Sequence, residues 1–312
     1  MKILFIDSNH DLLHQTLEAK GHQCDLNYHW TEEEIYDNIS QYEGIVIRSR
    51  IKVTKALIDK APALKFIARA GAGMENIDVA YATDKGITCL HAPEGNRDAV
   101  GEHTLAMLLS LFNNLNRANA EVRKGIWIRE GNRGIELMGK TVGIIGYGNM
   151  GSAFAQKLKG FGVTILAYDK YKTKYGNEFV KECALNELYE HADIISLHTP
   201  LTHETQYLIN ETFINNFKKN IFIINTARGK SCNTSDLANA INSGKVLGAC
   251  LDVLEYEGLS FENLNDKQLP NAFKQLINSE KVILTPHIAG WTHESNEKIA
   301  TILAEKVLKL ST

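Results

Sequence analysis

Short apolar runs alternate with helical patterns along almost the whole chain. In the first third, apolar runs suited to strands lie at residues 3–6, 44–47, 64–68 and 87–90, and apolar residues recur between them at helical spacing. Strands that alternate with helices are typical of βαβ units, in which the strands form a parallel sheet. Thr54 is expected to cap one of the helices, because its hydroxyl can accept a hydrogen bond from the first turn.

A second series of apolar runs follows a long helix. This helix is predicted from about residue 98 to residue 112 and is apolar on most sides, whereas residues 124–138 are polar and irregular. The six runs after it are 141–145, 163–168, 193–197, 221–225, 248–251 and 282–284. Six parallel strands is the number found in a dinucleotide-binding sheet.

The two series predict an α/β protein with two Rossmann-like doubly wound parallel sheets. A last helix is predicted over 294–310, after the second series has ended, and it can pack back on the first unit. The second unit is therefore expected to be inserted in the first. The expected domains are 1–98 with 288–312, and 99–287.

Composition limits the possible partners. The 312 residues are 44% hydrophobic and 23% charged, and the formal net charge is −3, whereas proteins that neutralise nucleic-acid phosphates carry a basic surplus. No apolar run reaches the roughly 18 residues that span a bilayer, and the N-terminus lacks a signal-peptide core. The five cysteines are widely spaced, without Cys-x-x-Cys, which argues against disulfides and a metal site. We expect a cytoplasmic protein with no nucleic-acid or membrane partner.

A glycine-rich turn carries the strongest chemical signal. Residues 146–151, Gly-Tyr-Gly-Asn-Met-Gly, fit G-x-G-x-x-G, follow a predicted strand and open a helix. Gly146 permits the tight turn, Gly148 lets a pyrophosphate approach the backbone, and Gly151 allows close packing of helix and strand. The helix N-terminus offers N–H groups to phosphate.

An acid at the end of the next strand points to the cofactor. Asp169 lies 23 residues after Gly146, where it can accept hydrogen bonds from a ribose. A carboxylate there repels the 2′-phosphate of NADP, so the expected cofactor is NAD. Lys170 and Lys172 nearby work against this preference, since they attract a phosphate.

Three further segments place polar side chains directly after apolar runs, and they contain Arg228, Glu257 and His287. An arginine can hold a carboxylate with a two-pronged contact and polarise a carbonyl. A histidine can exchange a proton near neutral pH. These groups beside a nicotinamide are what the reduction of a 2-keto acid requires.

Over nearly its whole length the chain resembles the D-isomer-specific 2-hydroxyacid dehydrogenase family. Besides the segments above, the resemblance is carried by Arg-Ala-Gly-Ala-Gly at 69–73, with Met-Glu-Asn-Ile-Asp after it, by Gly-Glu-His-Thr-Leu-Ala at 101–106, and by Ser-Leu-His-Thr-Pro-Leu at 196–201. It implies an NAD-dependent oxidoreductase with the cofactor between two lobes. Residues 99–287 are then the NAD-binding domain, the rest is the substrate-binding domain, and Arg228, Glu257 and His287 are the catalytic trio.

The resemblance also implies binding roles by position. The implied cofactor residues are Gly146, Gly148, Asn149, Met150, Gly151, Asp169, Thr199, Thr226, Ala227, Asp252 and Gly290. Ala72 and Gly73 lie where backbone N–H groups meet the substrate carboxylate. Two alternatives stay open: Thr199 as a turn residue before Pro200, and Asp252 as a structural cap.

The chain departs from the family near the catalytic acid. Gly258 stands where the family often has proline, and the stretch from Glu257 to His287 is long, which predicts a loop over 257–281 with a short helix at 271–276. The acid that pairs with His287 can therefore be Glu255 instead.

The first lobe is most similar to the phosphoglycerate dehydrogenases of serine biosynthesis. Arg48 and Arg69 follow neighbouring predicted strands and are candidates for binding a phosphate, with Arg129 as a weaker candidate. The best-supported reaction is 3-phosphoglycerate to 3-phosphohydroxypyruvate. Salt bridges within the lobe are the alternative role for Arg48 and Arg69, and glyoxylate, hydroxypyruvate and D-lactate are alternative substrates. No regulatory domain is expected after the last helix.

A second class of function stays open. The family includes NAD-sensing corepressor-like binding proteins with the same two lobes, whereas a Rossmann methyltransferase leaves the Arg, Glu and His segments unexplained. The resemblance also implies a homodimer formed across the cofactor domain.

Overall fold

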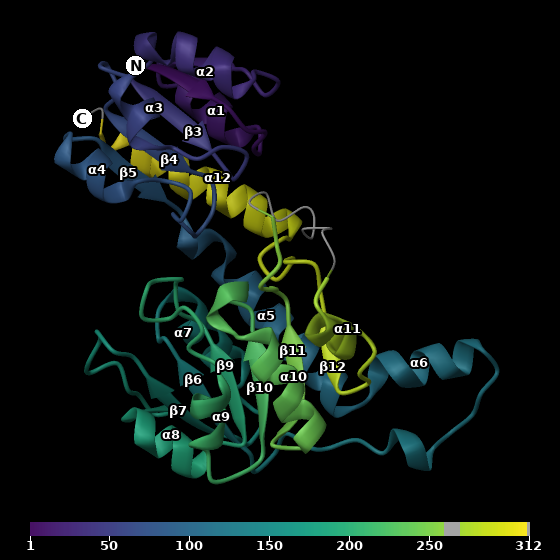
Figure 1. Cartoon of the computed structure of the whole chain (residues 1–312). Helices are drawn as coiled ribbons and strands as arrows, with labels where there is room; N and C mark the ends of the chain where they lie inside the picture. The colour runs from purple at the N-terminus through teal and green to yellow at the C-terminus, as the bar shows by residue number, and fades with distance from the viewer. Residues whose placement is uncertain (259–268, 311–312) are drawn as a thin grey trace. The chain divides into compact units, whose positions relative to one another are not determined.

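The computed structural model describes residues 1–258 and 269–310. The chain divides into two compact units, 1–97 with 291–312, and 98–290 (Figure 1). The boundaries between the two units thus fall after Arg97 and after Gly290, whereas the sequence predicted them after residues 98 and 287.

The first unit contains one parallel sheet. Its strands are Lys2–Phe5 (β1), Gln23–Leu26 (β2), Gly44–Ile47 (β3), Phe66–Arg69 (β4) and Thr88–His91 (β5). The order β2-β1-β3-β4-β5 reverses once, as in doubly wound folds. The expectation of four strands is wrong because it lacks β2. This edge strand has no fully buried residue, so its sequence has no apolar run.

Helices cover both faces of this sheet. Ile3 and Phe5 pack on one face, and Leu4 packs on the other. The first face is covered by Leu12–Glu18 (α1) and His293–Leu308 (α12), and the second by Glu32–Asn38 (α2), Ile39–Gln41 (η1), Lys55–Asp59 (α3) and Val79–Asp84 (α4). Thr54 caps α3, as expected, by accepting a hydrogen bond from the Leu57 N–H.

The last helix explains why the first unit is discontinuous. α12 buries Ile299, Leu303 and Val307 in the same apolar cluster as Ile3 and Phe5. It begins one residue before its expected start and ends at Leu308 rather than at residue 310. The C-terminal segment therefore completes the core that the N-terminal strands begin.

The second unit contains a parallel sheet of seven strands. They are Thr141–Ile145 (β6), Thr164–Tyr168 (β7), Val180–Glu182 (β8), Ile194–Leu197 (β9), Ile221–Asn225 (β10), Val246–Leu251 (β11) and Val282–Leu284 (β12). The order is β12-β11-β10-β9-β6-β7-β8, which is the dinucleotide-binding order with β12 added at one edge. The expected six strands lack β8, an edge strand of three residues with one buried side chain.

Helices flank this sheet too. They are Pro93–Phe112 (α5), Leu115–Arg123 (α6), Asn149–Lys157 (α7), Leu185–His191 (α8), Glu211–Asn215 (α9), Thr234–Ser243 (α10) and Asn271–Ile277 (α11), with 3-10 turns at Glu130–Asn132 (η2) and Gly229–Ser231 (η3). α5 and α7 pack on one face, and α8 to α11 pack on the other. α5 begins at Pro93 rather than near residue 98, since proline suits the first turn of a helix.

The long loop expected over 257–281 is described only in part. Its short helix is present as α11, whereas residues 259–268 lie outside the described residues. None of the helices in the described ranges combines the length and the apolar character that a membrane crossing needs.

Candidate active site

Three neighbouring strands of the second unit end at the same level. Asn225 at the end of β10 pairs with Leu251 of β11, and Leu251 pairs with Leu284 at the end of β12. The segments that carry the predicted catalytic residues therefore leave the sheet side by side. They do so at the carboxyl edge, where open α/β sheets bind their ligands.

The turn after β10 is fixed by a buried amide. Asn225 is fully buried; its Nδ2 donates to the Arg228 carbonyl over 2.9 Å, and its Oδ1 accepts from the Ala227 N–H over 3.1 Å. A Cβ atom on Gly229 would lie 1.9 Å from the Leu254 carbonyl oxygen. Only glycine permits this approach, which seats Arg228 beside the segment that leads to Glu257.

The structure pairs His287 with Glu257. Nδ1 of His287 lies 2.8 Å from Oε2 of Glu257, and both side chains are mostly buried. The other carboxylate oxygen of Glu257 accepts from the Leu254 N–H, which fixes the carboxylate. The imidazole orientation is thus set through Nδ1.

Glu255, the alternative partner of His287, is engaged elsewhere. One of its oxygens accepts from the Tyr207 hydroxyl over 2.8 Å, and the other accepts from the N–H and the hydroxyl of Thr234 over 3.1 and 2.8 Å. Glu255 therefore holds the first turn of α10.

A buried carboxylate organises the segment around His287. Asp252, 1% exposed, accepts from the Thr285 hydroxyl over 2.6 Å and from the N–H groups of Ile288 and Ala289 over 2.8 and 2.9 Å. His103 on α5 lies 3.5 Å from the same carboxylate. These contacts match the structural cap that the sequence left open for Asp252.

The backbone of His287 itself is strained. Its φ angle is +55°, in the left-handed region that residues with side chains rarely adopt. Such a conformation costs on the order of 1–3 kcal/mol and persists only where the surroundings impose it. Here the His287 N–H donates to the Asp252 carbonyl over 2.7 Å, and the next two N–H groups donate to its carboxylate.

Burial and hydrogen bonding shift the pKa of Asp252 in opposite directions. Burial favours the neutral acid and raises the pKa, but the hydrogen bonds from His103, Thr285, Ala289 and Ile288 outweigh it, so the pKa lies below its ordinary value of 3.8. Asp252 is therefore charged near neutral pH, and its contacts are those of an ionised carboxylate.

Two residues of α5 in this region were not predicted as site residues. The His103 Nε2 lies 3.1 Å from the Thr285 hydroxyl, and the fully buried Thr104 hydroxyl lies 3.1 Å from that of Thr226. The available signal is the Gly-Glu-His-Thr-Leu-Ala motif at 101–106, which contains both residues. The Thr226 hydroxyl thus contacts α5, although the sequence placed it along the cofactor groove, and Ala227 beside it is buried.

The glycine-rich turn has the shape that a dinucleotide needs. Gly146 has φ +91°, and a Cβ atom there would lie 2.8 Å from the His198 carbonyl oxygen. A Cβ atom on Gly151 would lie 2.1 Å from the Gly146 carbonyl oxygen, whereas one on Gly148 would meet nothing within 4 Å. The backbone is therefore packed tightly at Gly146 and Gly151 and open at Gly148, where a pyrophosphate would approach.

Other residues of this region agree with a bound dinucleotide. Asn149 and Met150 open α7, so their N–H groups belong to the first turn, which lacks helical acceptors. Thr199 Oγ1 is buried and makes no hydrogen bond within 1–258 and 269–310. Asp169 follows β7, and its carboxylate accepts from the N–H groups of Tyr147, Tyr171 and Lys172 over 2.8 to 3.0 Å. The residues present thus fit NAD.

The predicted substrate-binding residues gather in the first unit. Ile47 of β3 pairs with Arg69 of β4, so Arg48 and Arg69 lie at neighbouring strand ends, and Arg69 Nε donates to the Arg48 carbonyl over 3.2 Å. The N–H groups of Ala72 and Gly73 donate to no acceptor in the described part of the chain.

The Arg48 side chain lies against an aromatic ring. Its guanidinium carbon is 4.4 Å from the centre of the Trp291 ring, and within the described residues the guanidinium forms no ion pair. Burial lowers the pKa of Arg48, with Asp7 opposing that effect.

Two other candidate site residues lie elsewhere. Gly290, a candidate for cofactor binding, ends the second unit, and Arg129, the weaker candidate for phosphate binding, is exposed at the start of η2.

Known proteins similar to this chain share both units. The sequence profile described as D-isomer specific 2-hydroxyacid dehydrogenase, NAD binding domain, matches residues 105–289. The chain is 38% identical to a D-3-phosphoglycerate dehydrogenase of Methanocaldococcus jannaschii, over 99% of this chain and 57% of that protein. It is 36% identical to a hydroxypyruvate reductase of Thermotoga maritima, over 90% of this chain and 89% of the relative.

A solved structure agrees with these relatives. The D-lactate dehydrogenase of Aquifex aeolicus, complexed with NAD and lactic acid, matches with a TM-score of 0.84 and 31% identity, over 100% of this chain and 95% of that one. The chain therefore belongs to the D-isomer specific 2-hydroxyacid dehydrogenase family, with an NAD-binding domain, which confirms the resemblance seen in the sequence. It spans about half the length of the D-3-phosphoglycerate dehydrogenases that it matches.

Replacing Asp252 with asparagine is expected to lower the free energy of unfolding by about 2–5 kcal/mol near pH 7, because the backbone donors lose a charged acceptor. The folded pKa is depressed, so this stability is present above the unfolded pKa and is lost as the pH falls through the folded pKa. Urea unfolding of both proteins from about pH 7 down to about pH 3 checks this.

The exposed Glu190→Gln is the matched control for Asp252→Asn, and it should change little at any pH. A difference between wild type and Asp252→Asn that stays constant down to the lowest pH would contradict the assigned contacts.

Proposed function

We propose that this protein is an NAD-dependent dehydrogenase that interconverts a D-2-hydroxy acid and its 2-keto acid. The observation that carries the proposal is the Glu257–His287 pair, which lies at the carboxyl edge of the NAD-binding sheet next to the strand that leads to Arg228. NAD, when bound, accepts the hydride from C2 of the hydroxy acid.

His287 is the proposed acid–base group. Glu257 holds Nδ1, so the imidazole exchanges the substrate hydroxyl proton at Nε2. In the oxidation, the hydroxyl proton would pass to Nε2 of His287 as the C–H bond at C2 breaks, and a carbonyl group would be left. In the reduction, the imidazolium returns this proton to the oxygen that the hydride leaves negatively charged.

Arg228 is the proposed ligand of the substrate's carboxylate and reacting oxygen. A guanidinium presents several donors in one plane, so it can grip a carboxylate and stabilise the negative charge that develops on the oxygen. The Asn225 amide and the close Gly229–Leu254 contact fix its backbone. We assign Asp252 as a positioning residue, because its contacts hold the turn that carries His287.

For the substrate we propose 3-phosphoglycerate. Arg48 and Arg69 lie at neighbouring strand ends of the first unit. Burial disfavours the charged form of the Arg48 guanidinium, and an anionic ligand would offset this effect. A distal phosphate is such a ligand, and the substrate carboxylate would take the N–H groups of Ala72 and Gly73. The similarity to proteins named D-3-phosphoglycerate dehydrogenase supports this choice.

We also propose that the protein works as a homodimer held by the segment from α6 to residue 138. This arm projects from the body of the second unit (Figure 1). Its large apolar side chains are exposed, Trp127 by 78% and Met138 by 71%. The exposed apolar residues of the arm are Leu115, Val122, Ile126, Trp127, Ile128, Ile135 and Met138.

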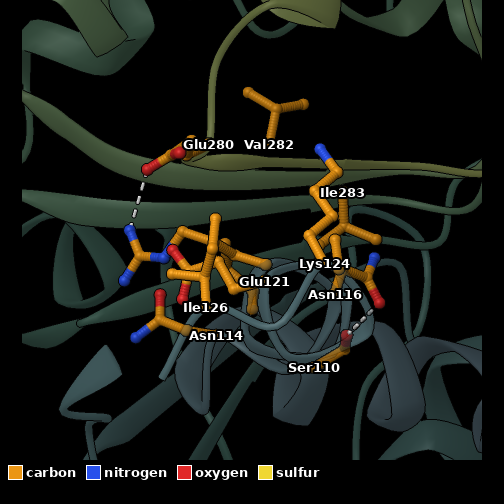
Figure 2. Close-up of a pocket in the computed structure, with 12 residues that line it drawn as sticks. Ser110, Asn114, Asn116, Glu121, Lys124, Ile126, Glu280, Val282 and Ile283 are labelled. Atoms are coloured by element: carbon orange, nitrogen blue, oxygen red, sulfur yellow. Dashed lines mark hydrogen bonds and ion pairs between the residues drawn. The ribbon is translucent and has the colours of Figure 1, made fainter. Parts of the chain in front are cut away.

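A pocket at the base of the arm fits the same contact. It has a volume of about 340 Å³ and lies between α6 and the edge strand β12, with Ile126, Val282 and Ile283 in its lining (Figure 2). The outer edge of β12 has no neighbouring strand in the described part of the sheet. A two-fold interface uses the same patch on each subunit. A second copy of the chain can therefore cover the pocket and the edge of β12 on both subunits.

Replacing His287 with alanine is expected to lower kcat by about 10²- to 10⁴-fold, because the proton donor is lost. The Kd for NADH should stay within about twofold, since the glycine-rich turn is untouched. NADH absorbance under steady-state conditions and fluorescence titration measure the two quantities. His191→Ala, an exposed histidine of the same unit, serves as control; an unchanged kcat for His287→Ala would refute the role.

Replacing Arg48 with alanine is expected to raise KM for 3-phosphoglycerate about 10- to 100-fold more than KM for D-glycerate, which lacks the phosphate. Kinetics with both acids give the ratio, and the exposed Lys52→Ala is the control. Equal losses for the two acids would show that Arg48 does not bind the phosphate.

Replacing Trp127 with glutamate is expected to turn the dimer into a monomer at micromolar concentration, because a charge would be buried in the interface. Sedimentation equilibrium measures the mass, and Leu26→Glu, at an exposed apolar position of β2, is the control. A wild type that sediments as a monomer would contradict the dimer.

A further inference from the structure

One carboxylate joins the loops that follow two strands of the sheet of the second unit. Glu204 accepts from Lys170 Nζ through one oxygen and from the Tyr171 hydroxyl through the other, each over 2.6 Å. Lys170 and Tyr171 follow β7, and Glu204 lies in the segment after β9. Because β7 and β9 flank β6 in the sheet, this contact links the two sides of the strand that ends at the glycine-rich turn.

We propose that Glu204 is a positioning residue for cofactor selectivity, which keeps Lys170 from binding the 2′-phosphate of NADP. The inference rests on the NAD site of the proposed function and deepens it. Asp169 is the carboxylate expected beside the ribose, and Lys170 is its neighbour in sequence. A lysine at this place would attract a 2′-phosphate if its charge were not already paired.

The local charges show why Glu204 matters. Asp169 and Glu204 are negative, and Lys170 and Lys172 are positive, so the four charges cancel. Lys172 already has partners of its own. Its backbone N–H donates to the Asp169 carboxylate over 3.0 Å, and its Nζ donates to the Tyr147 carbonyl over 3.3 Å. Removing the charge of Glu204 leaves one net positive charge, on the lysine next to the ribose-binding carboxylate.

The pair contributes to selectivity more than to stability. The side chains of Lys170 and Glu204 are 54% and 50% exposed, and an ion pair this exposed to water contributes little to the stability of a fold. The Glu204→Gln protein should therefore fold normally. A released lysine, by contrast, can form a charge-assisted contact with a phosphate that carries nearly two negative charges.

The test measures binding and does not depend on turnover. Fluorescence titration gives Kd for NADH and for NADPH in the wild type, Glu204→Gln, Lys170→Ala and the double variant. Glu187→Gln is the matched control, since Lys181 and the partly exposed Glu187 form another surface ion pair at 2.6 Å in the same unit. Titrations at two salt concentrations report how far charge determines each Kd.

Glu204→Gln is expected to bind NADPH about five- to tenfold more tightly than the wild type, with Kd for NADH changed less than about twofold. The gain should shrink at high salt and be absent from the double variant and from Glu187→Gln. An unchanged ratio of the two Kd values, or an equal gain in the double variant, would overturn the inference. A wild type that binds NADH but oxidises no 2-hydroxy acid would instead contradict the proposed reaction.

Discussion

The arrangement of the candidate site depends on the buried carboxylate of Asp252. Burying a charge is costly unless the surrounding groups donate hydrogen bonds to it. Asp252 meets this condition with donors from the segment after β12, and His103 of α5 lies near the same carboxylate. The same contacts impose the left-handed backbone of His287. One interaction thus satisfies a buried charge and holds the proposed acid–base group in an otherwise unfavourable conformation.

The strand register brings this segment to the cofactor side of the sheet. β10, β11 and β12 end in step, so the turns that carry Arg228, Glu257 and His287 start from one edge. The glycine-rich turn follows β6, which belongs to the same parallel sheet. Parallel strands place all their carboxyl ends on one edge, so the second unit supplies both the NAD site and the proposed catalytic groups.

Much of the fold was predictable because burial leaves a pattern in the sequence. Strands buried on both faces, such as β3 and β10, read as continuous apolar runs. The edge strands β2 and β8 do not, because most of their residues are partly exposed, and both were missed. The glycine pattern, with Asp169 after the next strand, was sufficient to predict the dinucleotide turn, since close packing requires glycine at Gly146 and Gly151 and the backbone is open at Gly148.

The details of the site needed coordinates. The sequence favoured Glu257 but left Glu255 as an alternative, and only the contacts show that Glu255 holds α10 while Glu257 meets His287. The contacts of His103 with Thr285, and of Arg48 with Trp291, join residues far apart in the chain. Such pairs follow from tertiary packing, which a single sequence does not specify.

The most direct test of the account follows the hydride itself. The wild-type protein is incubated with NAD and with D-3-phosphoglycerate or D-glycerate that carries deuterium at C2, and the reduced cofactor is examined by NMR. The deuterium is expected at C4 of the nicotinamide, on one face of the ring only. Reduced cofactor without deuterium, or tight NAD binding with no reduction by any D-2-hydroxy acid, would contradict it.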